Sequence, residues 1–179
     1  MLTRCSSREE LRNLDNNFSK KPMSDDEFSE KIEILGVSEE HLAMIPQLIT
    51  RGLTNYWGAV FEHLSPKRVV ASLVIDERHL QPWGILHGGV SVTLAETVAS
   101  IGTWFHCIPP NEHAVGLEIN ANHLRPVSSG TLVVTGVPIH TGGTIHVWGI
   151  QVVHREETHL VCTARCTVMK RCGGQTLTR

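Results

Sequence analysis

One acidic residue stands alone in a long apolar stretch of the chain. Glu96 is the only formally charged residue between Gln81 and Phe105. A carboxylate in such surroundings is costly to bury unless it is paired or used in chemistry. An ionised carboxylate can attack an electrophilic carbon or accept a proton from water. The alternative interpretation is an ordinary solvated helix face, but such a face would carry several charges rather than one.

Polar residues accompany Glu96 at helical spacing. The stripe consists of Gly89, Thr93, Glu96, Ser100 and Thr103. Residues spaced in this way lie on one face of a helix. The helix would begin at His87-Gly88-Gly89, where the first backbone N–H groups have no partner within the helix and favour negative charge. The stretch therefore predicts a nearly apolar helix to about Trp104, with free backbone donors at its start and an acid in its middle.

The flanking segments predict the elements that hold this helix. A capping pattern and helical spacing predict one helix from Ser24 to about Leu35 and another from Ser38 to about Arg51. Alternating apolar residues predict strands over 56–61 and 69–75, before the central helix. Four strands joined by short hairpins are expected after it, over 114–124, 131–140, 144–154 and 159–170. Pro138 predicts a bulge or a sheet edge.

This order of elements predicts an α+β fold in which one antiparallel sheet wraps around one long central helix. One sheet covers only one side of a helix that is apolar nearly all round, so a second copy should cover the rest and a dimer is the minimum expected. We expect this domain over residues 38–171. Residues 1–37 would form a partly disordered or helical N-terminal extension, and residues 172–179 a frayed tail.

Composition and charge exclude several classes of function. The net charge of −2 comes without a basic block, which argues against a nucleic-acid partner, and no apolar run is long enough to span a membrane. Eleven histidines occur without the spacing of a helical metal-binding pair, so neither a metal nor an organic cofactor is expected. Five cysteines without a secretory signal favour reduced thiols and a cytoplasmic location.

Two motifs carry a resemblance to a known family. The stretches Gln81–Glu96 and Val115–Arg125 resemble the hotdog-fold acyl-CoA thioesterases of the 4-hydroxybenzoyl-CoA and phenylacetate-degradation type, and among them the bacterial enzymes acting on 1,4-dihydroxy-2-naphthoyl-CoA. The resemblance covers about residues 40–170. It implies hydrolysis of an acyl- or aroyl-CoA ester, aromatic acyl groups included. It also implies a homotetramer built as a dimer of dimers, with active sites shared between subunits.

The resemblance also implies a role for each catalytic position. Glu96 corresponds to the carboxylate that attacks the thioester carbonyl or activates water, and Gly88 to the backbone N–H that polarises this carbonyl. Gln81 corresponds to a side chain that holds the thioester, His87 to the histidine beside the glycine, and Ser100 to a hydroxyl that orients water. Purely structural roles also stay open for two of these residues. His87 could stabilise the conformation of the loop before the helix, and Gln81 could cap that loop.

Further positions are expected to contact the substrate. They are Gly89, Thr97, Asn122, His123 and Arg125. His123 and Arg125 would meet the phosphates of coenzyme A, although a solvated strand end is an equally simple interpretation. Relatives often carry a basic residue near the Thr141–Ile145 turn, where this chain has Thr144 and Ile145. This departure leaves the position of the phosphates open.

The spacing along the helix supports a shared site. Glu96 lies eight residues beyond Gly88, so the two are about 12 Å apart along one helix. One carbonyl group cannot reach both within hydrogen-bond distance. We therefore expect Gly88 and Gln81 of one subunit to face Glu96 and Ser100 of another, with the two helices antiparallel.

Two other functions compete with hydrolysis. A hotdog hydroxyacyl-thioester dehydratase also has a carboxylate on its central helix, but the His-Phe-Pro-Gly-x-Pro text that precedes the helix in those enzymes is absent from this sequence. A non-catalytic module that binds acyl thioesters would tolerate loss of the acid. The presence of Glu96, His87-Gly88-Gly89 and Gln81 together favours the hydrolase.

Overall fold

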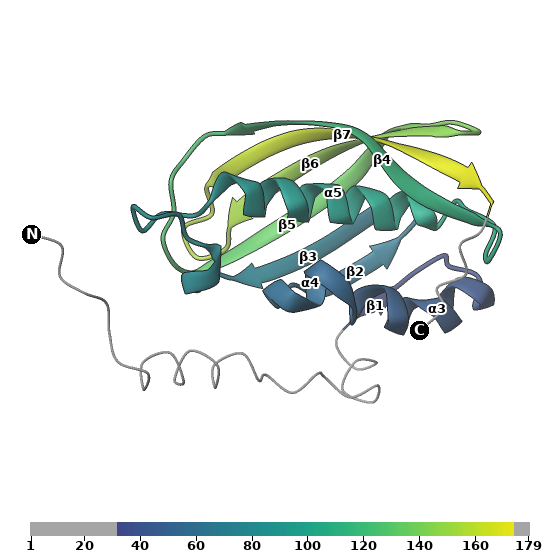
Figure 1. Cartoon of the computed structure of the whole chain (residues 1–179), viewed down its shortest axis with the longest axis horizontal. Coiled ribbons are helices and arrows are strands. Elements are labelled where there is room, and N and C mark those ends of the chain that lie inside the picture. The colour runs from purple at the N-terminus through teal and green to yellow at the C-terminus, as the bar shows by residue number, and fades with distance from the viewer. Residues whose placement is uncertain (1–31, 174–179) are drawn as a thin grey trace, which may run out of the picture.

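The structure is a computed structural model that describes residues 32–173. Seven strands form one sheet in the order β1-β2-β3-β5-β6-β7-β4, and helix α5 (Gly88–Trp104) lies across one face of it (Figure 1). The strands are β1 (Glu33–Ile34), β2 (Val60–Ser65), β3 (Arg68–Val74), β4 (Glu112–His123), β5 (Thr131–Thr141), β6 (Ile145–His154) and β7 (Leu160–Cys172). All neighbouring strands are antiparallel except β1 and β2. The expected α+β fold is confirmed.

Helix α5 forms the core together with the inner face of the sheet. Leu94, Ala95 and Val98 of α5 are at most 2% exposed. At Gly102 a Cβ atom would overlap with the indole of Trp148, so only glycine allows the helix to approach β6 this closely. The Trp148 Nε1–H donates a hydrogen bond of 2.9 Å to the Thr103 hydroxyl. Thr103, expected on the polar stripe with Glu96, therefore lies in the core.

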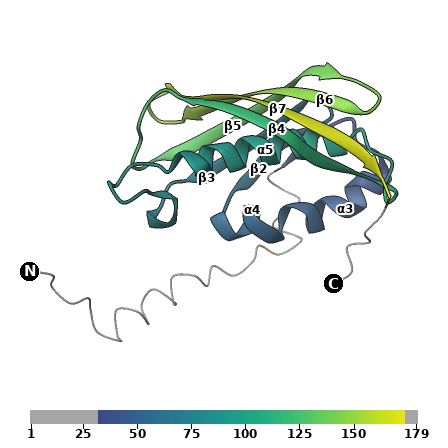
Figure 2. The same cartoon turned by 45° about the horizontal axis from the view of Figure 1, so that its top comes forward.

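Two helices precede the main part of the sheet and lie beside α5 (Figure 2). Helix α3 (Glu39–Ile49) begins after Ser38, whose hydroxyl accepts a hydrogen bond from the His41 N–H. The buried His41 ring donates through Nε2 to the Trp104 carbonyl at 3.1 Å. This bond joins α3 to the C-terminal end of α5. Helix α4 (Gly52–Trp57) follows and has no buried residue.

Two predictions for the segment before α5 are wrong. The helix expected from Ser24 to Leu35 is not present at its C-terminal end, because Glu33–Ile34 form β1. Residues 24–31 lie outside the described residues. The strand expected over 56–61 begins as a helix, since α4 ends only at Trp57. Gly58 ends α4 with a φ of 76°, in the left-handed region that glycine adopts freely. The alternating pattern therefore spans a helix end and the start of β2.

The four strands after α5 are confirmed to within about two residues. A register shift between Pro138 and His140 confirms the bulge predicted in this strand. The hairpin expected between the first two of these strands is wrong, because β4 pairs with β7, and β5 with β3 and β6. The connection from β4 to β5 is instead held by the Leu86 N–H, which donates to the Val127 carbonyl at 2.7 Å. This crossover leaves β4 at an edge of the sheet.

Most of the expected N-terminal extension and tail lies in residues 1–31 and 174–179, outside the described residues. None of the helices in the described part is both long and apolar enough to cross a membrane.

Candidate active site

The start of α5 presents a backbone donor. His87 occupies the cap position, and its Nδ1 accepts a hydrogen bond of 2.9 Å from the Gly89 N–H. Among the described residues, the Gly88 N–H has no acceptor. His87 therefore uses the donor of Gly89 and leaves that of Gly88 available. The positive end of the helix dipole adds to the attraction of this N–H for a partly negative oxygen.

A cavity of about 280 Å³ opens beside Gly88. Its lining residues are Gln81, Ile85, Leu86, Gly88, Ser91, His123, Leu124, Arg125, Pro126 and Val161. The His123 ring lies directly over the helix start, since a Cβ atom at Gly88 would be 2.8 Å from its Nε2. Four residues predicted from the sequence, Gln81, Gly88, His123 and Arg125, thus line one cavity. We call it the Gly88 cavity.

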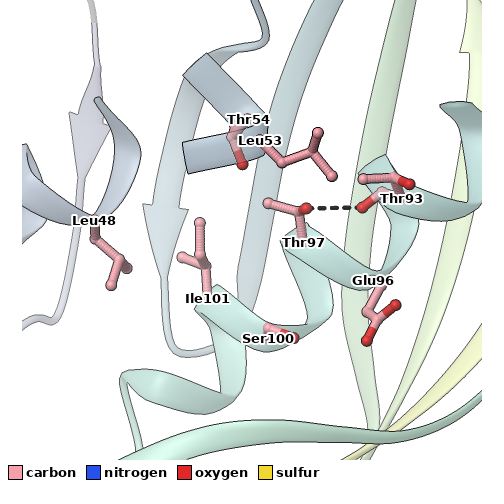
Figure 3. A pocket seen from close by; sticks show the side chains of 8 residues that line it. All are labelled: Leu48, Leu53, Thr54, Thr93, Glu96, Thr97, Ser100 and Ile101. Atoms are coloured by element: carbon pink, nitrogen blue, oxygen red, sulfur yellow. Dashed lines mark hydrogen bonds between the residues drawn. The ribbon is translucent and has the colours of Figure 1, made fainter. Parts of the chain in front are cut away.

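A second cavity, of about 320 Å³, contains the acid. Leu48, Leu53, Thr54, Thr93, Glu96, Thr97, Ser100 and Ile101 line it (Figure 3). The Thr97 hydroxyl donates to the Thr93 carbonyl at 2.7 Å, so this hydroxyl is committed to the helix backbone. The predicted residues Glu96, Thr97 and Ser100 lie together in this second cavity, which we call the Glu96 cavity.

The Glu96 side chain extends from α5 toward the edge of the sheet. A Cβ atom at Gly116 of β4 would overlap with Glu96 Oε1, so the carboxylate lies against bare backbone there. Burial, and after it the charges of Glu96 and Glu118, raise the pKa of the Cys166 thiol on β7 to about 12. In the single chain Glu96 remains exposed. The carboxylate is therefore accessible to a substrate or to water in front of β4.

The structure separates the predicted residues into two groups. Gly88 and Glu96 lie on the same helix but line different cavities. Gly89 lies at the helix start with its N–H bonded to His87, and Asn122 is exposed near the end of β4 without lining either cavity. A single chain does not bring the backbone donor and the acid together.

Sequence reasoning missed the walls that α3 and α4 contribute to the Glu96 cavity, formed by Leu48, Leu53 and Thr54. The helical spacing of α3 could have placed Leu48 on the face toward α5. The helix α4 could not be predicted in the same way, because its last residues were assigned to a strand over 56–61. Trp104 and Trp148 are buried, whereas Trp83 is 83% exposed on the loop before α5.

No group of three or more histidine, cysteine, aspartate or glutamate side chains within residues 32–173 is arranged to hold a metal ion. The polar groups that line the two cavities are the Glu96 carboxylate, serine and threonine hydroxyls, the Gln81 amide, the His123 imidazole, the Arg125 guanidinium and backbone groups.

Comparison with known proteins decides the family. Residues 84–168 match the Thioesterase superfamily. A putative esterase of Haemophilus influenzae is 39% identical over 127 residues, which cover 71% of this chain and 91% of the relative. The chain belongs to the thioesterase superfamily. This thioesterase is also 42% identical to the 1,4-dihydroxy-2-naphthoyl-CoA hydrolase of Listeria monocytogenes, over 65% of the chain and 94% of the relative.

The same family emerges from solved structures. The crystal structure of a thioesterase from Haemophilus influenzae has a TM-score of 0.66 and 37% identity, and the match covers 73% of this thioesterase and 90% of that chain. The resemblance to hotdog-fold thioesterases inferred from the sequence is therefore confirmed. The chain is a thioester hydrolase.

Proposed function

We propose that this thioesterase hydrolyses an acyl- or aroyl-CoA ester to the free acid and coenzyme A, at a site shared by two subunits. The observation that carries the proposal is the division of α5 into two half-sites. Gln81 and the Gly88 N–H line one cavity, and Glu96 and Ser100 line the other. Because these positions lie about 12 Å apart along the helix, one carbonyl group meets both only when two helices face each other.

The half-sites have complementary chemistry. The Gly88 N–H, with Gln81 beside it, polarises the thioester carbonyl and stabilises the negative charge that develops on its oxygen. In one route Glu96 of the second subunit attacks the carbonyl carbon, the carbon–sulfur bond breaks, and water that Ser100 orients then hydrolyses the acyl–Glu96 anhydride to the free acid. In the other route Glu96 removes a proton from water as it adds to the carbonyl carbon, and the carbon–sulfur bond breaks. In both routes the coenzyme A thiolate takes up a proton that water supplies. The charge on Glu96 is needed in either route.

The edge of the sheet supports an assembly of this kind. β4 is twelve residues long, and among the described strands it pairs with β7 alone. Its other edge therefore has no partner strand within residues 32–173, and Leu117 on β4 is 52% exposed. Pairing of two β4 edges in antiparallel fashion would continue the sheet and set two α5 helices antiparallel across the junction. We propose a dimer built at this edge, and a dimer of dimers as the complete assembly.

We propose an aromatic acyl group as the substrate, supported by the relatives in Listeria monocytogenes and Escherichia coli that are named 1,4-dihydroxy-2-naphthoyl-CoA hydrolases. The positions proposed to contact the substrate are Gly89, Thr97, Asn122, His123 and Arg125. His123 and Arg125 are the basic groups nearest the start of the helix in the Gly88 cavity, which fits contacts to coenzyme A phosphates. We propose a cytoplasmic location.

The test is release of coenzyme A by the wild type and by Glu96→Gln on a panel of short, long-chain and aromatic esters. Loss of the carboxylate should lower kcat by at least about a hundredfold, the range for a general base or nucleophile. Glu77→Gln, which changes an exposed carboxylate on the short 3₁₀ turn Glu77–His79, away from both cavities and from β4, is the matched control and should keep its activity. Equal activity of Glu96→Gln and wild type would refute the role of Glu96. An inert wild type that still binds these esters would favour a non-catalytic binding module.

A further inference from the structure

Helix α4 forms the outer wall of the Glu96 cavity. Leu53 and Thr54 of this helix line the cavity from the side opposite α5, and Leu48 of α3 lines it next to them. Figure 3 shows the Leu53 side chain extending over Thr97 toward Thr93. Leu53 is 52% exposed although it lines the cavity. An acyl group bound there would cover part of this exposed apolar surface.

The backbone around α4 sets it apart from the core. Its first residue, Gly52, has a φ of 70°, the following Gly58 has a φ of 76°, and no residue of the helix is buried. Among the described residues, two side chains hold its C-terminal end: Arg78 Nη1 donates to the Tyr56 carbonyl at 2.6 Å, and His79 Nε2 to the Trp57 carbonyl at 3.1 Å. The N-terminal turn, which carries Leu53, has no side-chain cap.

The size and polarity of the cavity suit a compact acyl group. In the single chain its volume is about 320 Å³, near the lower end of the range for small-molecule sites. The walls are mixed in polarity. Leu48, Leu53 and Ile101 are aliphatic, whereas the hydroxyls of Thr54 and Thr93 make no hydrogen bond with any other described residue. A compact acyl group with a polar substituent would satisfy both kinds of wall.

We propose that α4 determines the acyl specificity of this thioesterase, with Leu53 setting the size limit of the acyl group beyond Glu96. The inference rests on the proposed function, because it places the acyl group in the same cavity as the acid. It assigns specificity to a segment that contacts the substrate from outside the α5 helix. Leu53 selects the acyl group by contact with its far end, whereas the reacting carbonyl lies at Glu96.

The test compares Leu53→Ala and Leu53→Phe with the wild type on benzoyl-CoA and 2-naphthoyl-CoA, and on straight-chain esters from acetyl to octanoyl. Leu53→Ala should raise the naphthoyl-to-benzoyl ratio of kcat/KM by about tenfold or more, because each carbon added to or removed from an apolar pocket changes discrimination by about 10–200-fold. Leu53→Phe should lower the same ratio. Leu42→Ala removes another exposed leucine, on α3 and away from both cavities, and should leave the ratio unchanged.

The outcomes separate the two proposals. If each Leu53 variant changes kcat/KM by the same factor for every ester, the assignment of specificity to α4 is wrong, whatever the absolute activity. If the wild type releases no coenzyme A from any ester, the proposed function fails. In that case the affinities of the same esters, measured by calorimetry, still test α4: a size preference that moves with Leu53 supports the inference, and one that does not overturns it.

Discussion

At the scale of single residues, Glu96 depends on a residue that contributes no side chain. The carboxylate extends over Gly116 of β4, and any Cβ atom there would overlap with Glu96 Oε1. The backbone at this point is irregular, since the pairing of β4 with β7 shifts register between Gly116 and Glu118. A bulge next to a functional side chain commonly serves to direct it. Gly116 therefore determines where the carboxylate can lie.

We predict that Gly116→Ala lowers kcat by about tenfold or more, because displacement of a reacting group by about 1 Å can cost up to a hundredfold in rate. The melting temperature should change little by comparison, since Glu96 is exposed and can move away from the new methyl group. Steady-state kinetics and thermal unfolding measure both quantities. Gly143→Ala is the control, because a Cβ atom at Gly143 meets open space. Unchanged kcat in Gly116→Ala would show that the position of Glu96 is set elsewhere.

At the scale of elements, β6 carries a titratable group in the core. His146 is fully buried, and neither ring nitrogen has a hydrogen-bond partner among the described residues. Burial, and after it the nearby His106, Lys170 and His140, lower the pKa of His146 from the ordinary 6.5 to about 4. The ring is therefore neutral in the folded protein at neutral pH. An unfolded chain would take up a proton at higher pH than the folded one.

This difference makes stability depend on pH. Because the pKa of His146 is lowered in the folded state, its contribution to stability is complete above about pH 6.5 and is lost as the pH falls toward about 4. His146→Phe should therefore show a weaker loss of unfolding free energy over this range than the wild type. Denaturant unfolding at several pH values measures it, with His113→Gln as a control on the partly exposed β4. Parallel curves for wild type and His146→Phe would contradict the prediction.

The elements also show how far the sequence could predict this fold. The central helix and the four strands after it follow from local signals: the glycines at Gly88 and Gly89, the nearly apolar run to Trp104, and alternation in β5 to β7. The pairing of β4 with β7 could not be read in this way, because it joins strands separated by two others in the chain. Prediction of Glu96, Gly88 and Gln81 depended on motifs, whereas Leu53 faces the cavity only through the packing of α4 beside α5.

At the scale of the whole molecule, the separation of the two cavities predicts that each active site is formed by two subunits. This prediction can be tested with pairs of variants, without a structure of the assembly. Glu96→Gln damages one half-site and Gln81→Ala the other, so each variant alone should be nearly inactive. In a mixed dimer one site would carry both changes and the other neither. Random mixing after unfolding and refolding together should restore about a quarter of wild-type activity, because half of the dimers are mixed and each has one intact site. The same variants combined without subunit exchange should stay inactive.

Absence of recovery, with mixed dimers detected by mass spectrometry under native conditions, would place the whole reaction within one subunit. Recovery of the expected size would support the antiparallel arrangement of two α5 helices. The measurement is independent of which acyl group is used, provided that the wild type hydrolyses it.

The position of α4 in the chain has a consequence for how such enzymes diversify. The residues that match the thioesterase superfamily, 84–168, contain Gly88 and Glu96, whereas Leu48, Leu53 and Thr54 lie in the segment before them. On the proposed assignment, the residue that limits the size of the acyl group is therefore encoded upstream of the residues that carry out the reaction. Recombination upstream of the loop before α5 could exchange one substrate range for another while leaving the hydrolytic machinery intact. A chimera carrying residues 39–58 of a relative should then acquire the acyl preference of that relative.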